Sequence, residues 1–476
     1  MTTTPYWVAG QPATSDDLVE IRTPHDGALA GVTSNATAED VERAVAAAHA
    51  VAGDFADLPA HARAAALDHV SRRLAERADE VAALITAESG KPVKWSRIEV
   101  TRAVSTFRWA AEEARRFSGE LQRLDTDPAA NGRLALVRRA PRGPVLGIAP
   151  FNFPLNLVAH KVAPALAVGA PIVVKPAPTT PLVALLLGEL LAETDLPAGS
   201  WSVLPVPNEV AGGLADDPRL PVVSFTGSGP VGYSILDRVP RKHVVLELGG
   251  NAAAVVCPDW TDLDRAAQRI ATFSMYQGGQ SCISVQRVYA HQDVYPALAE
   301  AVVAHVRKLG TGDPTDPATD VGPLINEAAA RRVETWVDEA VAAGARLLTG
   351  GRRTGASYEP TVLADVPADC KVVDEEVFGP VVVLDSVPSV EEAFDLVNAS
   401  RFGLQAGLFT HDVRLAFRAA KRLAVGGVIV GDVPSFRADQ MPYGGVKESG
   451  TGREGVRAAM EDLTDQRVLV LTGLDL

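Results

Sequence analysis

The 476-residue sequence has three cysteines, no run of lysine and arginine, and no long uninterrupted apolar segment. Cys257, Cys282 and Cys370 are far apart and form no Cys-x-x-Cys pair, which argues against a disulfide framework and against a zinc or other metal site. A formal net charge of −14 disfavours nucleic acid as a partner. The uncharged stretch 144–160 is broken by proline and asparagine, so no membrane span is expected. The first residues lack a basic segment followed by an apolar one, so we expect no secretory signal and a cytoplasmic location.

The composition is that of an ordinary globular enzyme. Hydrophobic residues make up 47% and charged residues 22% of the chain, which allows large cores beneath a charged surface. A chain of this length is expected to form two or three domains. Its early part is predicted to be helical: Thr37 caps a helix that runs to about Ala52, and Pro59 begins a longer helix that ends before Gly90.

Short β-branched runs follow Gly143 and are separated by segments long enough for helices. The runs are 145–149, 172–174, 203–206, 222–225 and 244–248. This alternation predicts a parallel sheet with crossover helices, and chemistry is expected in the loops at the carboxyl ends of its strands. A second α/β unit is expected from residue 249 to about 445. The segment 467–471 is predicted to be an exposed strand that needs a partner, which favours strand exchange between subunits.

Residues 225–232 follow a predicted strand and contain a Gly-x-Gly-x-x-Gly spacing that begins at Gly227. Backbone amides at such a helix start can face a pyrophosphate, and the glycines permit its close approach. The same spacing also fits a simple tight turn between a strand and a helix, so it leaves both interpretations open.

Three further residues are candidates for chemistry, each with a structural alternative. Cys282, in a loop of small residues, is either an accessible thiolate whose pKa is lowered by a helix terminus or a cation, or a small buried hydrophobe. Glu247 is a carboxylate in an apolar strand, where desolvation would raise its pKa and suit a general base; it could instead bind an amide or an arginine. Asn152 is either an oxyanion donor or a turn residue beside proline.

Together these residues resemble the aldehyde dehydrogenase superfamily, in their order along nearly the whole chain. The motifs that carry the resemblance are 151–154 (FNFP), 174–176 (VKP), 225–228 (FTGS), 246–250 (LELGG), 279–282 (GQSC), 376–380 (EVFGP) and 442–447 (PYGGVK). The resemblance implies an α/β fold with a Rossmann-type cofactor domain at 1–119 and 141–248 and an α/β catalytic domain at 249–446. It also implies a small strand-exchange oligomerisation region at 120–140 and 447–476, and hence a homodimer or homotetramer.

The resemblance implies that the thiolate of Cys282 attacks a small-molecule aldehyde while Asn152 and the Cys282 amide stabilise the oxyanion. The thiohemiacetal would transfer hydride to NAD or NADP, and water activated by Glu247 would hydrolyse the resulting thioester to the acid. By the same resemblance, Lys161 would assist binding or proton transfer.

The resemblance also implies a set of cofactor contacts. The positions expected to form them are Lys175, Pro178, Gly227, Ser228, Leu248, Glu376 and Phe378. Lys175 would bind the adenosine ribose, Ser228 the pyrophosphate, and Glu376 with Phe378 the nicotinamide ribose. Pro178 replaces a glutamate that in many NAD-preferring members repels a 2′-phosphate, so NADP is not electrostatically excluded, although a modest preference for NAD is expected.

Other departures concern the substrate. Arg102, His160 and Arg437 occupy tunnel positions that are apolar or aromatic in members acting on hydrophobic aldehydes, and with Ser281 before the nucleophile they form the expected substrate site. Clustered cations suit an aldehyde with an anionic tail, such as a phosphonate, sulfonate, phosphate or carboxylate. Alternatively, Arg102 forms a surface ion pair and His160 only fills space, and the substrate is a short hydroxyaldehyde such as lactaldehyde. Phe151 replaces a common tryptophan, and nothing accounts for Asn251 in place of a frequent lysine.

Three other functions compete with this interpretation. A CoA-acylating semialdehyde dehydrogenase would share the nucleophile but release the acyl group to a thiol, which Glu247 disfavours. A structural protein that retains the fold would not need Cys282, Glu247 and Asn152 together. A cysteine hydrolase without a redox cofactor would not bind a dinucleotide.

Overall fold

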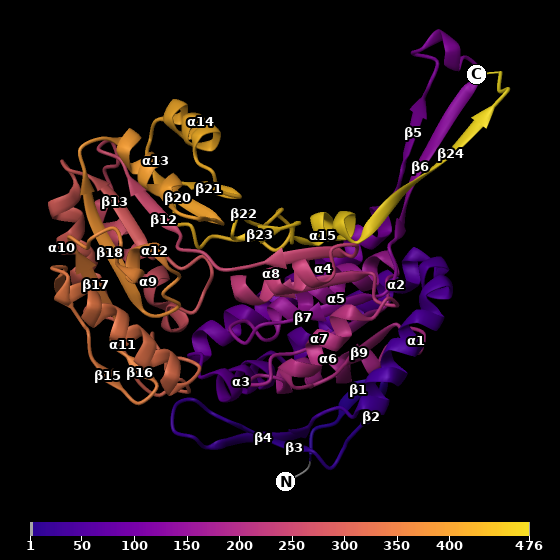
Figure 1. Ribbon diagram of the computed structural model, residues 1–476, viewed down its shortest axis with the longest axis horizontal. Helices are drawn as coiled ribbons and strands as arrows, with labels where there is room; N and C mark the ends of the chain where they lie inside the picture. The colour runs from indigo at the N-terminus through magenta and orange to yellow at the C-terminus, as the bar shows by residue number, and fades with distance from the viewer. Residues whose placement is uncertain (1–2, 476) are drawn as a thin grey trace.

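The computed structural model describes residues 3–475 and contains two large sheets and a protruding ribbon (Figure 1). The first sheet has eight strands in the order β2-β1-β9-β8-β7-β10-β11-β23. Their bounds are β1 (Tyr6–Val8), β2 (Gln11–Ala13), β7 (Val145–Ile148), β8 (Ile172–Lys175), β9 (Trp201–Val203), β10 (Val222–Thr226), β11 (His243–Glu247) and β23 (Gly450–Thr451). Strands β7 to β11 are parallel, as the β-branched runs predict. The run 203–206 was placed too late, because that strand ends at Val203.

Helices cover the first sheet. They are α1 (Ala38–Asp57), α2 (Ala60–Glu76), α3 (Ala78–Ser89), α4 (Val93–Arg116), α5 (Asn156–Val168), α6 (Leu182–Ala192), α7 (Asn208–Asp216), α8 (Gly229–Arg238) and α15 (Val456–Asp462). Thr37 caps α1 as predicted, but the helix continues to Asp57. The single helix expected from Pro59 to Gly90 is wrong: Arg77 leaves the helical conformation, with φ −103° and ψ 21°, and separates α2 from α3.

The second sheet has seven strands in the order β14-β17-β18-β13-β12-β20-β21 and lies within the predicted second α/β unit. Its strands are β12 (Ala253–Val256), β13 (Arg287–His291), β14 (Arg346–Thr349), β17 (Thr361–Ala364), β18 (Val381–Val387), β20 (Gln405–Phe409) and β21 (Gly427–Val430). Its helices are α9 (Leu263–Met275), α10 (Tyr295–Val306), α11 (Glu327–Ala342), α12 (Lys371–Asp374), α13 (Val390–Ala399) and α14 (Val413–Arg422). Across residues 3–475, no helix combines the length and the apolar character needed to cross a membrane.

Short elements connect these layers. They are β3 (Leu18–Arg22), β4 (Leu29–Ser34), β15 (Arg353–Thr354), β16 (Ser357–Tyr358), β19 (Phe402–Gly403), β22 (Val446–Lys447) and the 3-10 turns η1 (Pro128–Ala130) and η2 (Tyr276–Gly279). The β19-β22 pair carries the chain from the second sheet back to β23 at the edge of the first. The chain after the second sheet therefore returns to the first sheet, where β23 pairs with β11.

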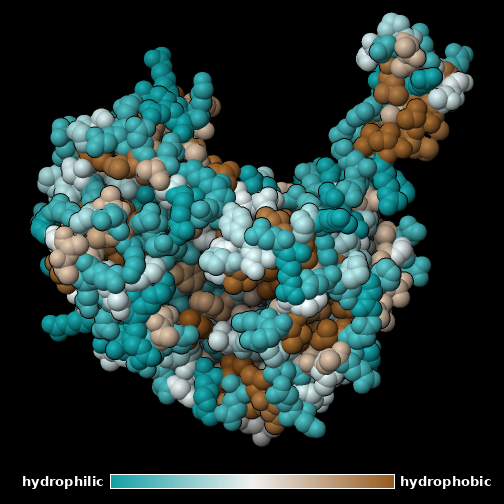
Figure 2. All heavy atoms as spheres, viewed as in Figure 1, coloured by the Kyte–Doolittle hydropathy of each residue, from teal (hydrophilic) through white to brown (hydrophobic). Residues whose placement is uncertain are grey.

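The ribbon is a three-stranded sheet that projects from the body and shows apolar surface near its tip (Figures 1 and 2). It consists of β5 (Glu120–Arg123), β6 (Arg133–Pro141) and β24 (Thr464–Thr472), in the order β24-β6-β5. The predicted C-terminal strand therefore has a partner within its own chain, β6, while its other edge is the sheet edge. The sequence analysis assigned residues 447–463 to the oligomerisation region with the ribbon. In the structure this segment packs on the first sheet and its helices through β23 and α15.

Candidate active site

The first sheet has a point at which its strand order reverses. Chain order runs from β7 through β8 to β9 on one side and then from β10 to β11 on the other, so the reversal lies between β7 and β10. Open parallel sheets bind ligands at the carboxyl ends of strands beside such a point. Asn152, Lys175, Ser228 and Glu247 follow or end β7, β8, β10 and β11, so the predicted site residues meet at this edge.

Cys282 lies in the loop after α9 and η2, where two close backbone approaches define its position. A Cβ on Gly279 would lie 2.0 Å from the Gly379 carbonyl oxygen, and a Cβ on Gly250 would lie 2.6 Å from the Cys282 carbonyl oxygen. Glycine is required at both positions because any side chain would collide with backbone. The Cys282 loop is therefore packed closely against the segment that follows Glu247.

Cys282 is free and partly exposed, and its sulfur lies 3.1 Å from the hydroxyl of Tyr443. Burial raises the pKa of the Cys282 thiol to about 12, and the Tyr443 hydrogen bond opposes this rise. The expectation of a lowered pKa is wrong for this conformation. The loop follows the carboxyl end of α9 instead of beginning a helix, and desolvation outweighs the charge of Arg437.

Asn152 faces the same loop. Its side-chain nitrogen donates to the Gln280 carbonyl at 2.9 Å, while its own side-chain oxygen is buried and finds no hydrogen-bond partner within residues 3–475. The amide group has two hydrogens, so one remains for a further acceptor beside Cys282. This geometry suits an oxyanion donor better than a simple turn residue.

Glu247 is 3% exposed, and neither of its carboxylate oxygens has a hydrogen-bond partner in the described part of the chain. Burial, reinforced by the charge of Glu454, raises the pKa of Glu247 well above its ordinary value. The structural alternative was that Glu247 binds a backbone amide or an arginine. Within residues 3–475 the carboxylate forms neither hydrogen bond. A buried carboxylate with a raised pKa and free oxygens has the character of a general base.

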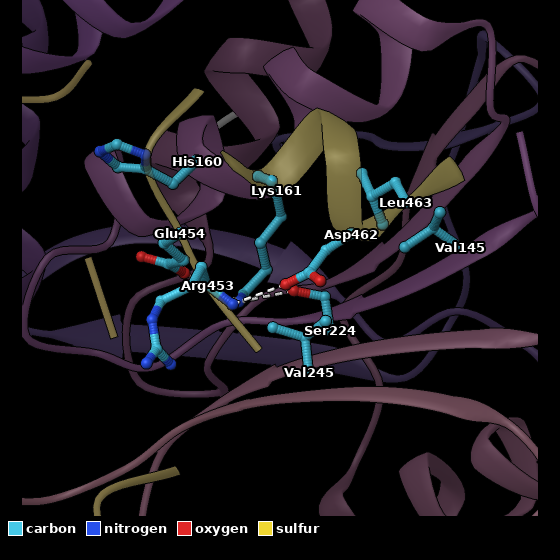
Figure 3. A pocket seen from close by; sticks show the side chains of 10 residues that line it. Val145, His160, Lys161, Ser224, Val245, Arg453, Glu454, Asp462 and Leu463 are labelled. Carbon is cyan, nitrogen blue, oxygen red and sulfur yellow. Dashed lines mark hydrogen bonds and ion pairs between the residues drawn. The ribbon is translucent and has the colours of Figure 1, made fainter. Parts of the chain in front are cut away.

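Lys161, Ser224 and Glu454 line a small cavity, in which the Lys161 ammonium lies beside the Ser224 hydroxyl (Figure 3). Lys161 donates to Ser224 at 3.1 Å and Thr226 at 2.7 Å, and its ammonium lies 3.5 Å from Glu454. Arg437 binds the other Glu454 oxygen at 2.9 Å. Burial alone would raise the pKa of Glu454, but the two cations hold it at about 2.

A second carboxylate, Asp439, joins the other two predicted substrate cations. Its Oδ1 accepts from Arg102 at 2.9 Å and lies 3.1 Å from His160 Nε2. Burial lowers the pKa of His160 and favours its neutral form, with Arg437 adding to the effect. Burial alone would raise the pKa of Asp439, but the His160 hydrogen bond and the Arg102 charge hold it well below its usual range. Arg102 thus forms an ion pair, although with a buried carboxylate and not on the helix surface.

The Ser281 side chain is bound by a residue of the same loop. Tyr276 donates to it at 2.7 Å, and the serine is buried. Ser281 is therefore held within the Cys282 loop, whereas Arg102 and His160 share the carboxylate of Asp439 and Arg437 binds Glu454.

A groove of about 630 Å³ runs between the two large sheets' loops and has the features of a dinucleotide site. Its lining includes Ser228, Gly229, Gly249, Glu376 and Phe402. Glu376 accepts from the Gly250 amide at 3.0 Å, and a Cβ on Gly249 would lie 2.4 Å from the Glu376 carboxylate. Glycine backbone beside a carboxylate fits the pyrophosphate and ribose hydroxyls of a nicotinamide dinucleotide. Burial raises the pKa of Glu376 to about 7.

Five predicted cofactor residues are absent from the described lining of this groove: Lys175, Pro178, Gly227, Leu248 and Phe378. Lys175 donates to Asn208 at 2.7 Å, and Pro178 is exposed on the loop beyond it. The Gly227 amide donates to the Glu247 carbonyl. Leu248 packs closely against Gly232, where a Cβ would lie 2.5 Å from the leucine side chain. These contacts define a tight turn between β10 and α8, and the role of residues 225–232 in pyrophosphate binding stays a prediction. Phe378, at φ 46°, stacks edge-on against Phe151.

Sequence reasoning missed three residues of the site: Tyr443, Asp439 and Glu454. Tyr443 lies inside the 442–447 motif, which served as a family marker and not as a source of chemistry. Asp439 is only two residues from Arg437, so its position in the sequence could have identified it as a residue near the predicted substrate site. Glu454 is distant in sequence from Lys161 and Arg437 and could not be paired with them without the fold.

Comparison with known proteins identifies the family and the fold. Residues 7–469 match the aldehyde dehydrogenase family. The chain is 42% identical to a 3-sulfolactaldehyde dehydrogenase of Priestia aryabhattai, over 98% of this chain and 97% of that protein. It is also similar to two crystal structures. One is aldehyde dehydrogenase 21 of Physcomitrella patens in complex with the reaction product succinate (TM-score 0.97, 45% identity, all of both chains). The other is an NADP-dependent glyceraldehyde-3-phosphate dehydrogenase of Bacillus halodurans C-125 complexed with NADP (TM-score 0.95, 33% identity, 99% and 100% of the two chains).

The chain therefore belongs to the aldehyde dehydrogenase family, and the fold inferred from its motifs is confirmed. It is an NAD(P)-dependent aldehyde dehydrogenase. The family assignment leaves the aldehyde itself to be inferred from the side chains around Cys282.

Proposed function

We propose that this enzyme oxidises a short aldehyde with an anionic tail, of the sulfonate or carboxylate kind, to the corresponding acid. The observation that carries this proposal is the buried guanidinium of Arg437. Its side chain is 6% exposed and lies 3.9 Å above the ring of Tyr443, which contacts the Cys282 sulfur. Its Nε is buried and has no hydrogen-bond partner among residues 3–475. A buried cationic donor without a full set of acceptors favours an anionic ligand.

The charge balance of the pocket supports the same class of substrate. Arg102, Arg437 and Lys161 face two carboxylates, Asp439 and Glu454, whose low pKa keeps them ionised. The shifts of His160 and Glu247 favour their neutral forms. Burial lowers the pKa of Lys161 as well, so the two guanidinium groups are the cations that support an anionic tail.

In the proposed reaction, the Cys282 thiolate attacks the aldehyde carbon, and the second amide hydrogen of Asn152 and the Cys282 backbone amide hold the oxyanion. When bound, the nicotinamide dinucleotide supplies the oxidising equivalents that convert this adduct to a thioester. Glu247 takes a proton from water, which attacks the thioester carbonyl. The acid leaves, and the Cys282 sulfur is restored.

Lys175, Ser228 and Glu376 would hold the adenosine ribose, the pyrophosphate and the nicotinamide ribose of that cofactor. The acceptor beside Lys175 is the neutral Asn208, and Pro178 carries no charge. A 2′-phosphate is therefore not repelled by a carboxylate at these two positions, which supports use of either NAD or NADP.

The test compares two aldehydes that differ only in the tail. 3-Sulfolactaldehyde is lactaldehyde with a sulfonate on its terminal carbon, so the ratio of their kcat/KM values measures recognition of the anion. We expect a ratio of at least about ten, worth about 1.4 kcal/mol in transition-state binding. Succinic semialdehyde against butanal provides a second matched pair for a carboxylate tail.

A ratio near or below one for both pairs would contradict the anionic tail and favour lactaldehyde. The same assay with Cys282→Ala should show no cofactor reduction, and persistent reduction would contradict the mechanism. Adding coenzyme A separates hydrolysis from acyl transfer to a thiol: product that remains free acid supports Glu247 as the base.

We also propose a homodimer or homotetramer in the cytoplasm, with the ribbon as the oligomerisation element. Leu121 and Val468 on this ribbon are 64% and 61% exposed. Apolar side chains on an open sheet edge favour pairing with a second copy of the chain. A Val468→Lys variant should shift the mass in sedimentation toward the monomer, whereas an unchanged mass would contradict this role.

A further inference from the structure

Tyr443 is a buried phenol that the proposed reaction does not use. Its hydroxyl lies 3.1 Å from the Cys282 sulfur, the atom that forms the covalent bond in this family. Its backbone is paired with that of Glu454 in both directions, at 2.9 Å and 2.7 Å. Its ring packs in a small apolar cluster with Ile283 and Leu404, against Cys282. Backbone pairing and side-chain packing therefore both hold the phenol beside the sulfur.

The direction of the hydrogen bond depends on the state of the sulfur. A neutral thiol can donate to or accept from a phenol, but a thiolate can only accept. Burial raises the pKa of Tyr443 well above its ordinary value, so the phenol keeps its proton at neutral pH and remains a donor. A hydrogen bond to the charged form of a group favours that form.

Arg437 strengthens this donor. Its guanidinium lies 3.9 Å from the centre of the Tyr443 ring, close to the ideal position for a cation over an aromatic face. Positive charge at this position draws electron density from the ring and makes the hydroxyl a better donor. Tyr443 therefore connects the proposed tail-binding arginine to the nucleophile.

We propose that Tyr443 is a further catalytic residue, whose hydroxyl donates to the Cys282 thiolate and stabilises it for attack on the aldehyde. On ionisation the thiol proton leaves to solvent, and the phenol keeps its own proton. When the sulfur lone pair forms the carbon–sulfur bond, the negative charge moves to the aldehyde oxygen and the phenol hydrogen bond weakens. Without this donor, few compensating contacts remain for a thiolate in such a desolvated loop.

The test measures the rate of iodoacetamide alkylation of Cys282 against pH, without aldehyde or cofactor, so it is independent of the proposed substrate. In Tyr443→Phe the ring and its packing remain and only the hydroxyl is lost. We expect the pH midpoint of alkylation to rise by about one unit, and the rate at neutral pH to fall about tenfold. Cys282→Ala identifies the background from Cys257 and Cys370.

Tyr276→Phe is the matched control. It also removes a buried phenol from this region, but within residues 3–475 that phenol donates to Ser281 and has no hydrogen bond to the Cys282 sulfur. Its alkylation midpoint should equal that of the unmodified enzyme. A midpoint in Tyr443→Phe that equals the wild-type value, or one that moves equally in both variants, would overturn the proposal.

A second readout follows thiolate formation directly by its ultraviolet absorption during a pH titration, alongside thermal unfolding of each variant. The proposal requires the absorption midpoint in Tyr443→Phe to rise with the alkylation midpoint. A purely structural role for the hydroxyl would lower the unfolding temperature and leave both midpoints in place.

Discussion

Glu247 and Glu454 are two buried glutamates in one cluster whose ionisation differs completely. Glu247 has no hydrogen-bond partner within residues 3–475, and its pKa is raised well above the ordinary value. Glu454 is equally buried, but Lys161 and Arg437 hold its pKa at about 2. Burial is common to both, so the nearby cations decide which carboxylate is charged. The unpaired one is free to exchange a proton, and the paired one holds the two cations in place.

The largest effect is expected from Glu247→Gln, which keeps the shape of the side chain and removes its basicity. Thioester hydrolysis should slow by about 10³-fold, the usual contribution of a general base. Rapid mixing should then show a burst of reduced cofactor followed by a very slow steady state, with the acyl group found on Cys282 by mass spectrometry. Rapid steady turnover without a burst would show that the unpaired carboxylate is not the base.

Removing one cation from Glu454 should affect substrate choice. In Arg437→Gln we expect kcat/KM for 3-sulfolactaldehyde to fall by about 10- to 100-fold, the range of one lost charge-assisted hydrogen bond, and that for lactaldehyde to fall much less. Steady-state kinetics with both aldehydes measures the ratio. Equal losses for the two aldehydes would assign Arg437 to holding Glu454 and not to the tail.

Neutralising the paired glutamate should make Glu247 easier to ionise. The Glu454 charge contributes to the raised pKa of Glu247, and Glu247 is active as a base only when ionised. In Glu454→Gln the rising limb of kcat against pH should therefore move to lower pH by about one unit. The profile must be measured where hydrolysis limits turnover. A shift to higher pH would show that the two carboxylates are not coupled in this direction.

The smallest shift is expected from Lys161→Gln, and its sign should be opposite. Lys161 lowers the pKa of Glu247, so its removal should move the same limb to higher pH, by less than one unit. Measuring both variants under one condition sharpens the comparison, because a non-specific loss of packing would move both limbs the same way.

Much of this site could be predicted from the sequence, because local patterns specify local structure. The runs 145–149 and 222–225 predicted parallel strands, and their carboxyl ends carry Asn152 and Ser228 as expected. The break at Arg77 was not predictable from the helical periodicity on either side of it. The raised pKa of Cys282 could not be predicted either, because it depends on atoms that only the folded chain brings around the sulfur.

The sequence by itself determined the family and the two α/β units, because ordered motifs and periodic apolar runs are local properties of the chain. Only the tertiary structure decided which charges are paired. Two ion pairs, Asp439 with Arg102 and Glu454 with Lys161, join residues that are 337 and 293 positions apart in the sequence. The energy of an ion pair depends on distance and desolvation in space, and neither quantity is written in the order of the residues.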